Sequence, residues 1–362
     1  MNQEINNTLE AYKQNQSATE IRHQDNNSNK PQTSTIFDWA NDFILSDDEA
    51  NAIANPEWII PDLIISGHVI LIPAEPNGGK TTIMFYLAGL MAEQDYKVFY
   101  VNADISGGDA KPLVKIAKDL NFSLLLPDMK TGLSIDHVIL KLVGLSNSDK
   151  RLDNTVFIFD TVKKMLNVMS KDAAKRFFQL MRTLSAKGMT IILLAHTNKY
   201  PDKDGKPIYE GTGDMRADVD ELIYLIPQRN DDKSMIVTTA PDKQRGSFKP
   251  ISFNLAADRT VTILGEVIDT IAANKHAKVM IKDEPIINAI IAAINAGNVS
   301  QQVIIDYCSQ HYKLGERSVK KILSKYAHEC DSSIKDELTT AHLWKKERGE
   351  RNSYSFSILS PN

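Results

Sequence analysis

One segment restricts the possible folds of this chain more than any other. A glycine-rich turn, Ala74-Glu75-Pro76-Asn77-Gly78-Gly79-Lys80-Thr81-Thr82, separates the apolar run 68–72 from a stretch with apolar residues at helical spacing, 80–94. The backbone N–H groups of such a turn can converge on phosphate oxygens, and the N-terminus of the helix adds partial positive charge. The sequence therefore predicts a strand, a phosphate-binding loop and a helix in succession.

The residue types in this turn predict how it binds ATP and Mg²⁺. Lys80 is expected to reach the β and γ phosphates, and the hydroxyl of Thr81 to bind the metal. Ala74 stands at the first glycine of the usual pattern G-x-x-x-x-G-K-[ST], so a tighter first turn is expected. The alternative is a turn that merely starts a helix. The expected nucleotide-binding residues are Glu75, Pro76, Asn77, Gly78, Gly79, Lys80, Thr81 and Thr82.

The remaining pattern predicts an α/β fold. Continuous apolar runs at 97–102, 155–159 and 190–194 alternate with helical stretches, as is typical of parallel strands buried on both faces. After residue 220 the helices disappear, and short strands follow one another across polar turns. We expect these to extend the sheet in antiparallel fashion, at 221–226, 234–240, 249–254 and 259–264.

The length of 362 residues predicts two folded units and a tail, at about 150 residues per domain. Residues 1–34 are rich in Asn, Gln, Ser and Thr, which predicts a disordered tail. We expect the nucleotide-binding domain at 35–271, a linker at 272–282 and a second domain at 283–362.

Composition excludes some classes of protein. Lys and Arg total 42 against 46 Asp and Glu, so any nucleic-acid surface must be local. Cys308 and Cys330 are the two cysteines and form no CxxC pair, which argues against a disulfide scaffold or a zinc site. Apolar runs stay below the roughly 18 residues of a membrane span, and the N-terminus lacks the order of a signal peptide. A cytoplasmic protein is expected.

Asp160 is the expected partner of the phosphate-binding loop. It ends the apolar run 155–159, at the position where a carboxylate would hold Mg²⁺ together with Thr81. An Asp at a strand end is also a common turn former, so that alternative stays open.

Two further strand ends carry candidate catalytic residues. Asp104 follows the strand 97–102, which we expect to lie next to the strand before the loop, and it is the candidate to orient and deprotonate the attacking water. Asp109 is a weaker substitute, and a turn-forming role for Asp104 is the alternative. His196 ends another buried strand and is expected to sense the γ-phosphate, although a lone histidine is often structural.

The order of these motifs resembles the RecA-like hexameric ATPases, and within them the RepA-type plasmid replicative helicases and their DnaB-type relatives, over about 58–264. That family has a catalytic glutamate where this chain offers Asp104, one methylene shorter. The family's Lys-x-Arg-Gly stretch looks like Lys243-Gln244-Arg245-Gly246. The resemblance implies that Lys243 and Arg245 act on the nucleotide of a neighbouring subunit in a ring, expected to be a hexamer. An ordinary basic hairpin is the alternative.

The same resemblance assigns contact with single-stranded DNA to two basic loops, one after Asp160 and one after His196. Flexible basic loops suit the tracking of a phosphate backbone, and they equally suit a solvated surface. The expected contacts are Lys163, Lys164, Lys199, Lys203 and Lys206.

The C-terminal pattern resembles a winged helix. Helical stretches at 285–296, 300–312 and 317–327 precede a hairpin with a basic tip at 343–359. In a winged helix the third helix enters the major groove of duplex DNA and the wing contacts the backbone. A docking or assembly role is the alternative. The expected DNA contacts are Arg317, Lys320, Lys321, Lys345, Lys346 and Arg348.

These expectations combine into an ATP-dependent DNA helicase or translocase acting in replication of a plasmid, phage or mobile element. Two alternatives stay open. One is an ATP-switched DNA-binding or assembly protein with slow hydrolysis and no unwinding, and the other is a RecA-like recombination or regulatory ATPase. Stimulation of turnover by single-stranded DNA and opening of a forked duplex would distinguish the helicase from the switch.

Overall fold

The computed structural model describes residues 38–105, 107–165, 171–200, 202, 206–210, 214–329, 342–348 and 353–359. The chain divides into two compact units, Met1–Ile53 and Ala54–Asn362. In its described part the first unit contains the 3-10 helix η1 (Asp38–Phe43) and the helix α2 (Asp47–Asn51). The predicted tail, 1–34, lies outside the described residues.

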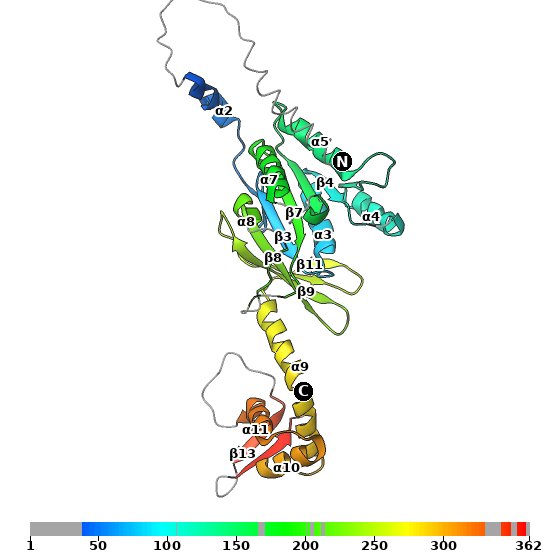
Figure 1. Ribbon diagram of the computed structural model, residues 1–362, viewed down its shortest axis with the longest axis vertical. Helices are drawn as coiled ribbons and strands as arrows, with labels where there is room; N and C mark the ends of the chain where they lie inside the picture. The colour runs from blue at the N-terminus through cyan, green and yellow to red at the C-terminus, as the bar shows by residue number, and fades with distance from the viewer. Residues whose placement is uncertain are drawn as a thin grey trace, which may run out of the picture. The chain divides into compact units, whose positions relative to one another are not determined.

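The second unit is built on a nine-stranded sheet in the order β11-β10-β9-β8-β3-β7-β6-β4-β5 (Figure 1). The strands from β8 to β5 in this order are parallel, and β9 to β11 continue the sheet in antiparallel fashion. This confirms the predicted α/β fold, a RecA-like P-loop core with an antiparallel extension. The strands are β3 (Val69–Ala74), β4 (Lys97–Asn102), β5 (Ser123–Leu125), β6 (Thr155–Asp160), β7 (Thr190–His196), β8 (Glu221–Arg229), β9 (Met235–Lys243), β10 (Ser252–Leu255) and β11 (Val261–Ile263), with β1 (Trp58–Ile60) and β2 (Ile64–Ile65) in a separate pair.

Two details of the predicted topology were wrong. Strand β4 does not lie next to β3, because β7 and β6 lie between them. Strand β8 was expected to be antiparallel, but it pairs in parallel with β3, with Ile70 aligned to Glu221. A parallel neighbour requires a crossover connection, and the segment containing helix α8 (Asp214–Asp218) provides it between β7 and β8.

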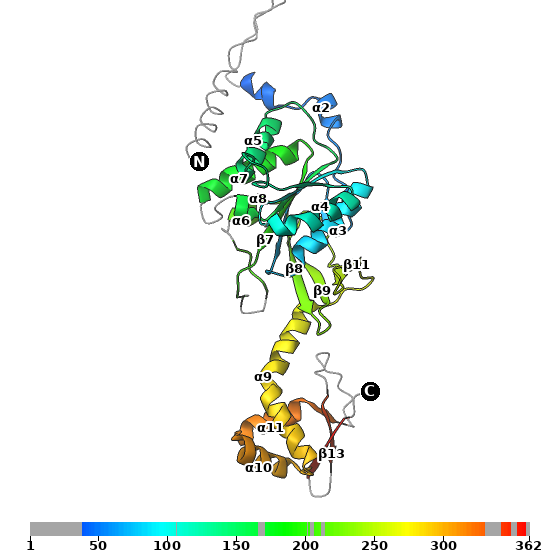
Figure 2. The ribbon, with the colours of Figure 1, turned by 90° about the vertical axis from the view of Figure 1, so that its right-hand side faces the viewer.

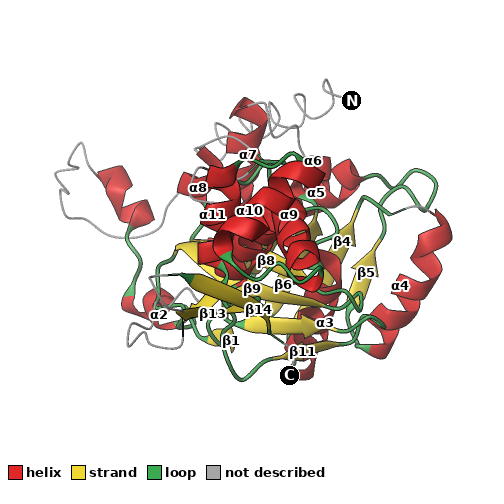
Figure 3. Cartoon of the chain, turned by 90° about the horizontal axis from the view of Figure 1, so that it is seen from below, coloured by secondary structure: helices red, strands yellow, loops and turns green. Residues whose placement is uncertain are grey.

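Helices cover both faces of the parallel strands. Figure 2 shows α3 (Lys80–Glu93) and α4 (Gly107–Asp119) on one side and α5 (Ile135–Ser146) and α7 (Lys171–Ala186) on the other. Figure 3 shows α6 (Val162–Met165) and α8 on the same side as α7. Successive side chains of β3 lie on opposite faces of the sheet, since Ile70 packs in the cluster with α3 and Leu71 in the cluster with α7. Burial on both faces explains the continuous apolar runs in the sequence.

The C-terminal part contains α9 (Thr270–Asn295), α10 (Gln301–Tyr312) and α11 (Glu316–Lys325). Strand β13 (Trp344–Arg348) pairs antiparallel with β14 (Tyr354–Ile358) and parallel with β12 (Ala327–Glu329), which the sequence did not predict. The predicted linker, 272–282, is helical, since α9 starts at Thr270 behind the N-cap Asp269 and continues through Pro285. The winged-helix assignment and the domain limits stay predictions. Among the described helices none is long and apolar enough to cross a membrane.

Candidate nucleotide-binding site

The phosphate-binding loop connects the end of β3 to the start of α3, as predicted. Gly79 is the N-cap of α3 with φ 79°, and no side chain caps the helix there. The first N–H groups of α3 therefore remain available to a ligand. A Cβ at Gly79 would lie 2.4 Å from Cδ2 of Leu255, so the loop has no room for a side chain at this position. Ala74 is fully buried in β3 and aligned with His196, so its methyl group packs in the core.

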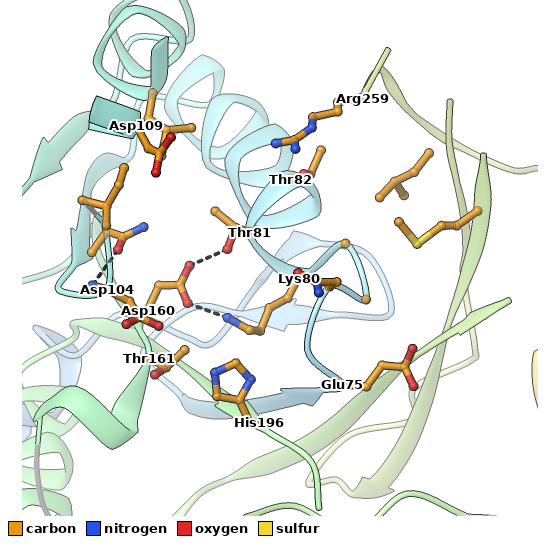
Figure 4. Close-up of a pocket in the computed structure, with 18 of the residues that line it drawn as sticks. Glu75, Lys80, Thr81, Thr82, Asp104, Asp109, Asp160, Thr161, His196 and Arg259 are labelled. Carbon is orange, nitrogen blue, oxygen red and sulfur yellow. Dashed lines mark hydrogen bonds and ion pairs between the residues drawn. The ribbon is translucent and has the colours of Figure 1, made fainter. Parts of the chain in front are cut away.

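Asp160, at the carboxyl end of β6, is bound by three donors, of which Figure 4 shows Lys80 and Thr81. Its Oδ1 lies 2.5 Å from Nζ of Lys80, and its Oδ2 accepts hydrogen bonds from Oγ1 of Thr81 at 2.7 Å and from the hydroxyl of Tyr100 at 2.8 Å. Asp160 is 3% exposed and Lys80 is 7% exposed. A buried carboxylate needs such partners, because desolvation of an unpaired charge is costly.

Tyr100 was not predicted from the sequence, which treats it as one apolar residue of β4. Its pKa lies well above the usual value, because burial and then the negative charge of Asp160 both disfavour the phenolate. Tyr100 therefore stays protonated and donates to Asp160 at neutral pH.

The residues fit a nucleotide with Mg²⁺. A cavity of about 570 Å³ lies over the loop, lined by Asn77, by the residues from Gly78 to Thr82, and by Asp160 and His196. The hydroxyl of Thr81 and the carboxylate of Asp160 are hard oxygen ligands, which suit Mg²⁺. The uncapped helix start and the ammonium of Lys80 suit phosphate.

His196 ends β7 beside this cavity, where its backbone aligns with Ala74. Its Nδ1 is buried and makes no hydrogen bond among the described residues. Burial, followed by the charge of Lys80, lowers the pKa of His196. A neutral imidazole with an unsatisfied nitrogen is suited to a hydrogen bond with a bound phosphate.

Asp104 lines the cavity from a lateral position, since β4 lies two strands further from β3 than predicted. Its side chain is 48% exposed and lies 3.1 Å from Nζ of Lys164. Asp109, from the first turn of α4, lines the same cavity. The structure thus brings both candidate carboxylates to the nucleotide cavity.

The wall of the cavity formed by the antiparallel strands was not predicted. The turns β8–β9 and β10–β11 bring residues from far along the chain opposite the loop, and Arg259 lies across from Asp109 in Figure 4. Nothing in the local sequence marks these residues, because only the strand order places them there. Pro76, in contrast, does not line this cavity. The residues of this wall are Lys233, Met235, Leu255, Ala256, Ala257 and Arg259.

Lys243 and Arg245 lie outside the lining of the nucleotide cavity. The ammonium of Lys243 donates to the carbonyl oxygens of Arg216, Ala217 and Val219 at 2.6–2.9 Å, at the end of α8. Burial, then the charge of Arg245, lowers the pKa of Lys243.

Arg245 is held by a buried carboxylate. Its Nη1 lies 2.9 Å from Oδ1 of Asp220, which is 2% exposed. Asp220 also accepts from Nη1 of Arg182 on α7 at 2.6 Å and from the backbone N–H of Val69 at 2.9 Å. Asp220 therefore keeps two partners if Arg245 moves away.

Most of the predicted DNA-contacting lysines of the core form ion pairs within the chain. Lys163 pairs with Glu210 at 2.7 Å, Lys164 with Asp104, and Lys206 with Asp242. Lys199 lies 5.6 Å from the ring centroid of Tyr200. Lys203 lies outside the described residues.

In the C-terminal part, α11 has a buried face with Val319 and an exposed face with Arg317, Lys320 and Lys321. Lys320 pairs with Glu316 at 2.6 Å. The remaining predicted contacts are on β13, where Lys345 lies 2.5 Å from Glu347, Lys346 lies 4.2 Å from the ring centroid of Tyr354, and Arg348 is exposed.

Comparisons with known proteins agree with this site. A family model described as an AAA domain matches residues 40–202, less than half of the chain. The DNA repair protein RadA of Campylobacter jejuni subsp. jejuni is 24% identical over 145 residues, which are 38% of this chain and 30% of RadA. The chain thus spans less than a third of that relative.

Among solved structures, the flagellar accessory protein FlaH from Methanocaldococcus jannaschii is similar with a TM-score of 0.38 and 16% identity, over 56% of this chain and 92% of FlaH. The strand order and the phosphate-binding loop give the core the fold of the RecA-like P-loop NTPases.

Proposed function

We propose that this chain is an ATP-driven DNA helicase or translocase of the RepA type that works as a hexameric ring in replication of a plasmid, phage or mobile element. The observation that carries the proposal is the separation of two groups of residues. Lys80 and Asp160 meet in the nucleotide cavity, whereas Lys243 and Arg245 lie outside its lining. Basic residues so placed can assist hydrolysis only in the cavity of a neighbouring subunit, which requires an oligomer.

The side chains divide the chemistry of hydrolysis among them. Thr81 and Asp160 would hold Mg²⁺, which polarises phosphoryl oxygens when bound. Lys80 would leave Asp160 for the β and γ phosphates, and His196 would contact the γ-phosphate. Asp104 would orient the attacking water, and Arg245 of the neighbouring subunit would stabilise the charge that develops in the transition state.

The proposed DNA contacts rest on the positive charge of basic side chains in the core and in the C-terminal part. Single-stranded DNA would pass the basic loops of the core, where phosphates replace the carboxylate partners of Lys163 and Lys164. The exposed basic face of α11 and the hairpin β13–β14 would contact duplex DNA. We place this activity in the cytoplasm.

Two observations favour a second candidate, an ATP-switched DNA-binding or assembly protein without unwinding. Asp104 is paired with Lys164, and Lys243 is bound to three carbonyl groups, so both need rearrangement before catalysis. A third candidate is a RecA-like recombination or regulatory ATPase, and the similarity to RadA, a protein named for DNA repair, is in line with it. Electron microscopy with ATP separates the closed rings of the first proposal from the filaments of the third.

The test of the first proposal is steady-state ATP hydrolysis with and without single-stranded DNA, together with opening of a forked duplex. Stimulation by DNA and strand separation are expected, and both should be lost in the Lys80→Ala and Arg245→Ala variants. Arg245→Ala should still bind nucleotide. Arg182→Ala is the matched control, because it removes an arginine from the same Asp220 and should keep most of the turnover.

Slow turnover that does not respond to single strands would support the switch instead. Equal loss of turnover in Arg182→Ala and Arg245→Ala would refute the trans role of Arg245, because it would trace the effect to Asp220.

A further inference from the structure

Some exposed lysines form no ion pair among the described residues, and two of them lie in the first turns of α9. Lys163, Lys164 and Lys206 are neutralised within the chain, so phosphate binding there must first break an ion pair. Lys275 and Lys278, in the first turns of α9, form no ion pair among the described residues and are exposed. A lysine without an ion pair can neutralise a phosphate and release the counterions condensed on the nucleic acid without first losing a carboxylate partner.

These lysines line a cleft of about 700 Å³, here called the basic cleft, on the other side of the phosphate-binding loop. Its apolar surface includes Pro76, Ile226 and Ile271, and its rim carries Lys199, Lys275 and Lys278. Lys275 and Lys278 are three residues apart, and so lie on the same face of α9.

The first turns of α9 are fixed against the core beside the cleft. Nδ2 of Asn274 donates to the carbonyl oxygen of Pro227 in β8 at 2.9 Å, and Ile271 packs against the core cluster of α7. Lys275 and Lys278 are therefore presented from a helix anchored on the sheet, which lowers the entropy cost of holding a ligand.

The basic cleft shares a wall with the nucleotide cavity. Glu75 lines both, and its Oε1 lies 2.5 Å from Nη1 of Arg229, which also lines the cleft. Nη2 of Arg229 donates to the carbonyl oxygen of Asn77 at 3.4 Å. The cleft thus borders the phosphate-binding loop through a side chain that contacts the loop twice. Its four basic residues and one carboxylate leave it positive.

We propose that the basic cleft binds a segment of single-stranded nucleic acid, with two phosphates held by Lys275 and Lys278 and a base against the apolar surface. The charge of the rim, the apolar floor and the border with the ATP site favour this ligand over others. The inference rests on the proposed function, which makes single-stranded DNA the substrate, and it moves the main contact from the loop lysines to α9.

The test is the salt dependence of binding to a fluorescently labelled oligo(dT), followed by anisotropy on the full chain with a non-hydrolysable ATP analogue. Removing two phosphate contacts from a single strand is expected to lower the slope of log K against log salt by about 1.4. We expect this loss, with weaker binding, in the double variant Lys275→Ala/Lys278→Ala. A melting temperature near that of the wild type shows that the variant is folded.

The matched control is Lys115→Ala/Lys118→Ala, which removes two exposed lysines at the same spacing from α4. Its slope should equal that of the wild type. An equal change in both double variants, or none in either, would overturn the proposal. Competition by a polyglutamate peptide as strong as that by unlabelled oligo(dT) would also overturn it, because the cleft would then select acidic peptides.

The binding and turnover results together distinguish failure of the cleft proposal from failure of the proposed function. If single strands stimulate ATP turnover in the wild type and the α9 variant binds them with an unchanged slope, the cleft proposal fails alone. If the wild type neither binds single strands nor responds to them, the motor proposal fails and the cleft proposal fails with it.

Discussion

Replacing Tyr100 by Phe is expected to destabilise the nucleotide-free core while leaving its packing intact. The ring lies edge-on to Phe85 with centroids 4.6 Å apart and near Phe122 at 6.1 Å, and a phenylalanine keeps both contacts. The substitution removes only the hydroxyl that donates to Asp160 at 2.8 Å. The buried carboxylate then keeps Lys80 and Thr81 as its donors.

The expected loss follows from the charge of the acceptor. A hydrogen bond to a charged group contributes about 1.5–3 kcal/mol to stability. Because Asp160 keeps two donors, we expect the lower part of this range, about 1.5–2 kcal/mol. For a domain of this size, roughly 2–4 °C of melting temperature correspond to each kcal/mol, so the variant should melt about 3–8 °C lower.

The assay is scanning calorimetry of the full chain without nucleotide, and Tyr86→Phe is the control. Tyr86 is half-buried in α3 and also loses only its hydroxyl, but Asp160 takes its bonds from other residues. A decrease in Tyr100→Phe no larger than that in Tyr86→Phe would refute the assignment of Tyr100 as a support for Asp160.

The pH dependence of stability, compared between the wild type and Tyr100→Phe, tests the same hydrogen bond in a second way. The pKa of Tyr100 is raised in the folded protein, so its contribution to stability is complete below about pH 10, where the unfolded tyrosine titrates. Above that pH the unfolded wild type loses a proton that the folded state keeps, and the stability difference from Tyr100→Phe should shrink. Burial also raises the pKa of Tyr224 to about 12, but this residue is common to both proteins and cancels. A difference that stays constant through pH 11 would contradict the reasoning.

Three further predictions concern other parts of the molecule. Gly79→Ala should weaken nucleotide binding at least tenfold, because the new Cβ would collide with Leu255 and the residue has a φ of 79°. The left-handed backbone alone costs about 1–2 kcal/mol for a residue other than glycine. Titration with a fluorescent nucleotide measures the affinity, and an unchanged affinity would contradict the prediction. His196→Ala should keep nucleotide binding and lose DNA-stimulated turnover. A nucleotide titration and an ATPase assay with single-stranded DNA check it, and stimulation equal to that of the wild type would contradict it. Trp344→Phe should destabilise the C-terminal part by about 1–3 kcal/mol, because Nε1 of Trp344 donates to the carbonyl oxygen of Leu323 at 2.7 Å. A urea titration followed by circular dichroism measures this loss of stability, and an unchanged unfolding midpoint would contradict the prediction.

The sequence predicted the parts of the fold that local chemistry determines. The run 97–102 is strand β4 as predicted, and the stretch 80–94 is α3, which ends at Glu93. The phosphate-binding loop was recognisable because glycines followed by a lysine at the start of a helix are typical of phosphate binding. Residues at the carboxyl ends of parallel strands meet at one edge, so Asp160 and His196 were expected at the cavity and lie there.

The wrong predictions concern features that depend on which strands are neighbours in the sheet. Local sequence does not determine whether β4 lies next to β3, and Asp104 consequently approaches the cavity from a more lateral position than expected. In the sequence Tyr100 is one apolar residue of a strand, because its hydroxyl reaches Asp160 only through the pairing of β4 with β6. The start of α9 was missed because residues 270–284 lack a clear apolar stripe, whereas packing on β8 supports the helix there.

The ion pair between Lys164 and Asp104 bears on both proposed functions. One partner is a predicted DNA contact and the other the predicted water-orienting residue, so the two roles compete for the same interaction. Both side chains are about half exposed, and a surface pair of this kind contributes at most about 1 kcal/mol. A DNA phosphate is therefore able to displace Asp104 from Lys164, which leaves the carboxylate free to contact water. Slow turnover without DNA is consequently compatible with the motor as well as with the switch, and the response to single strands is the property that separates them.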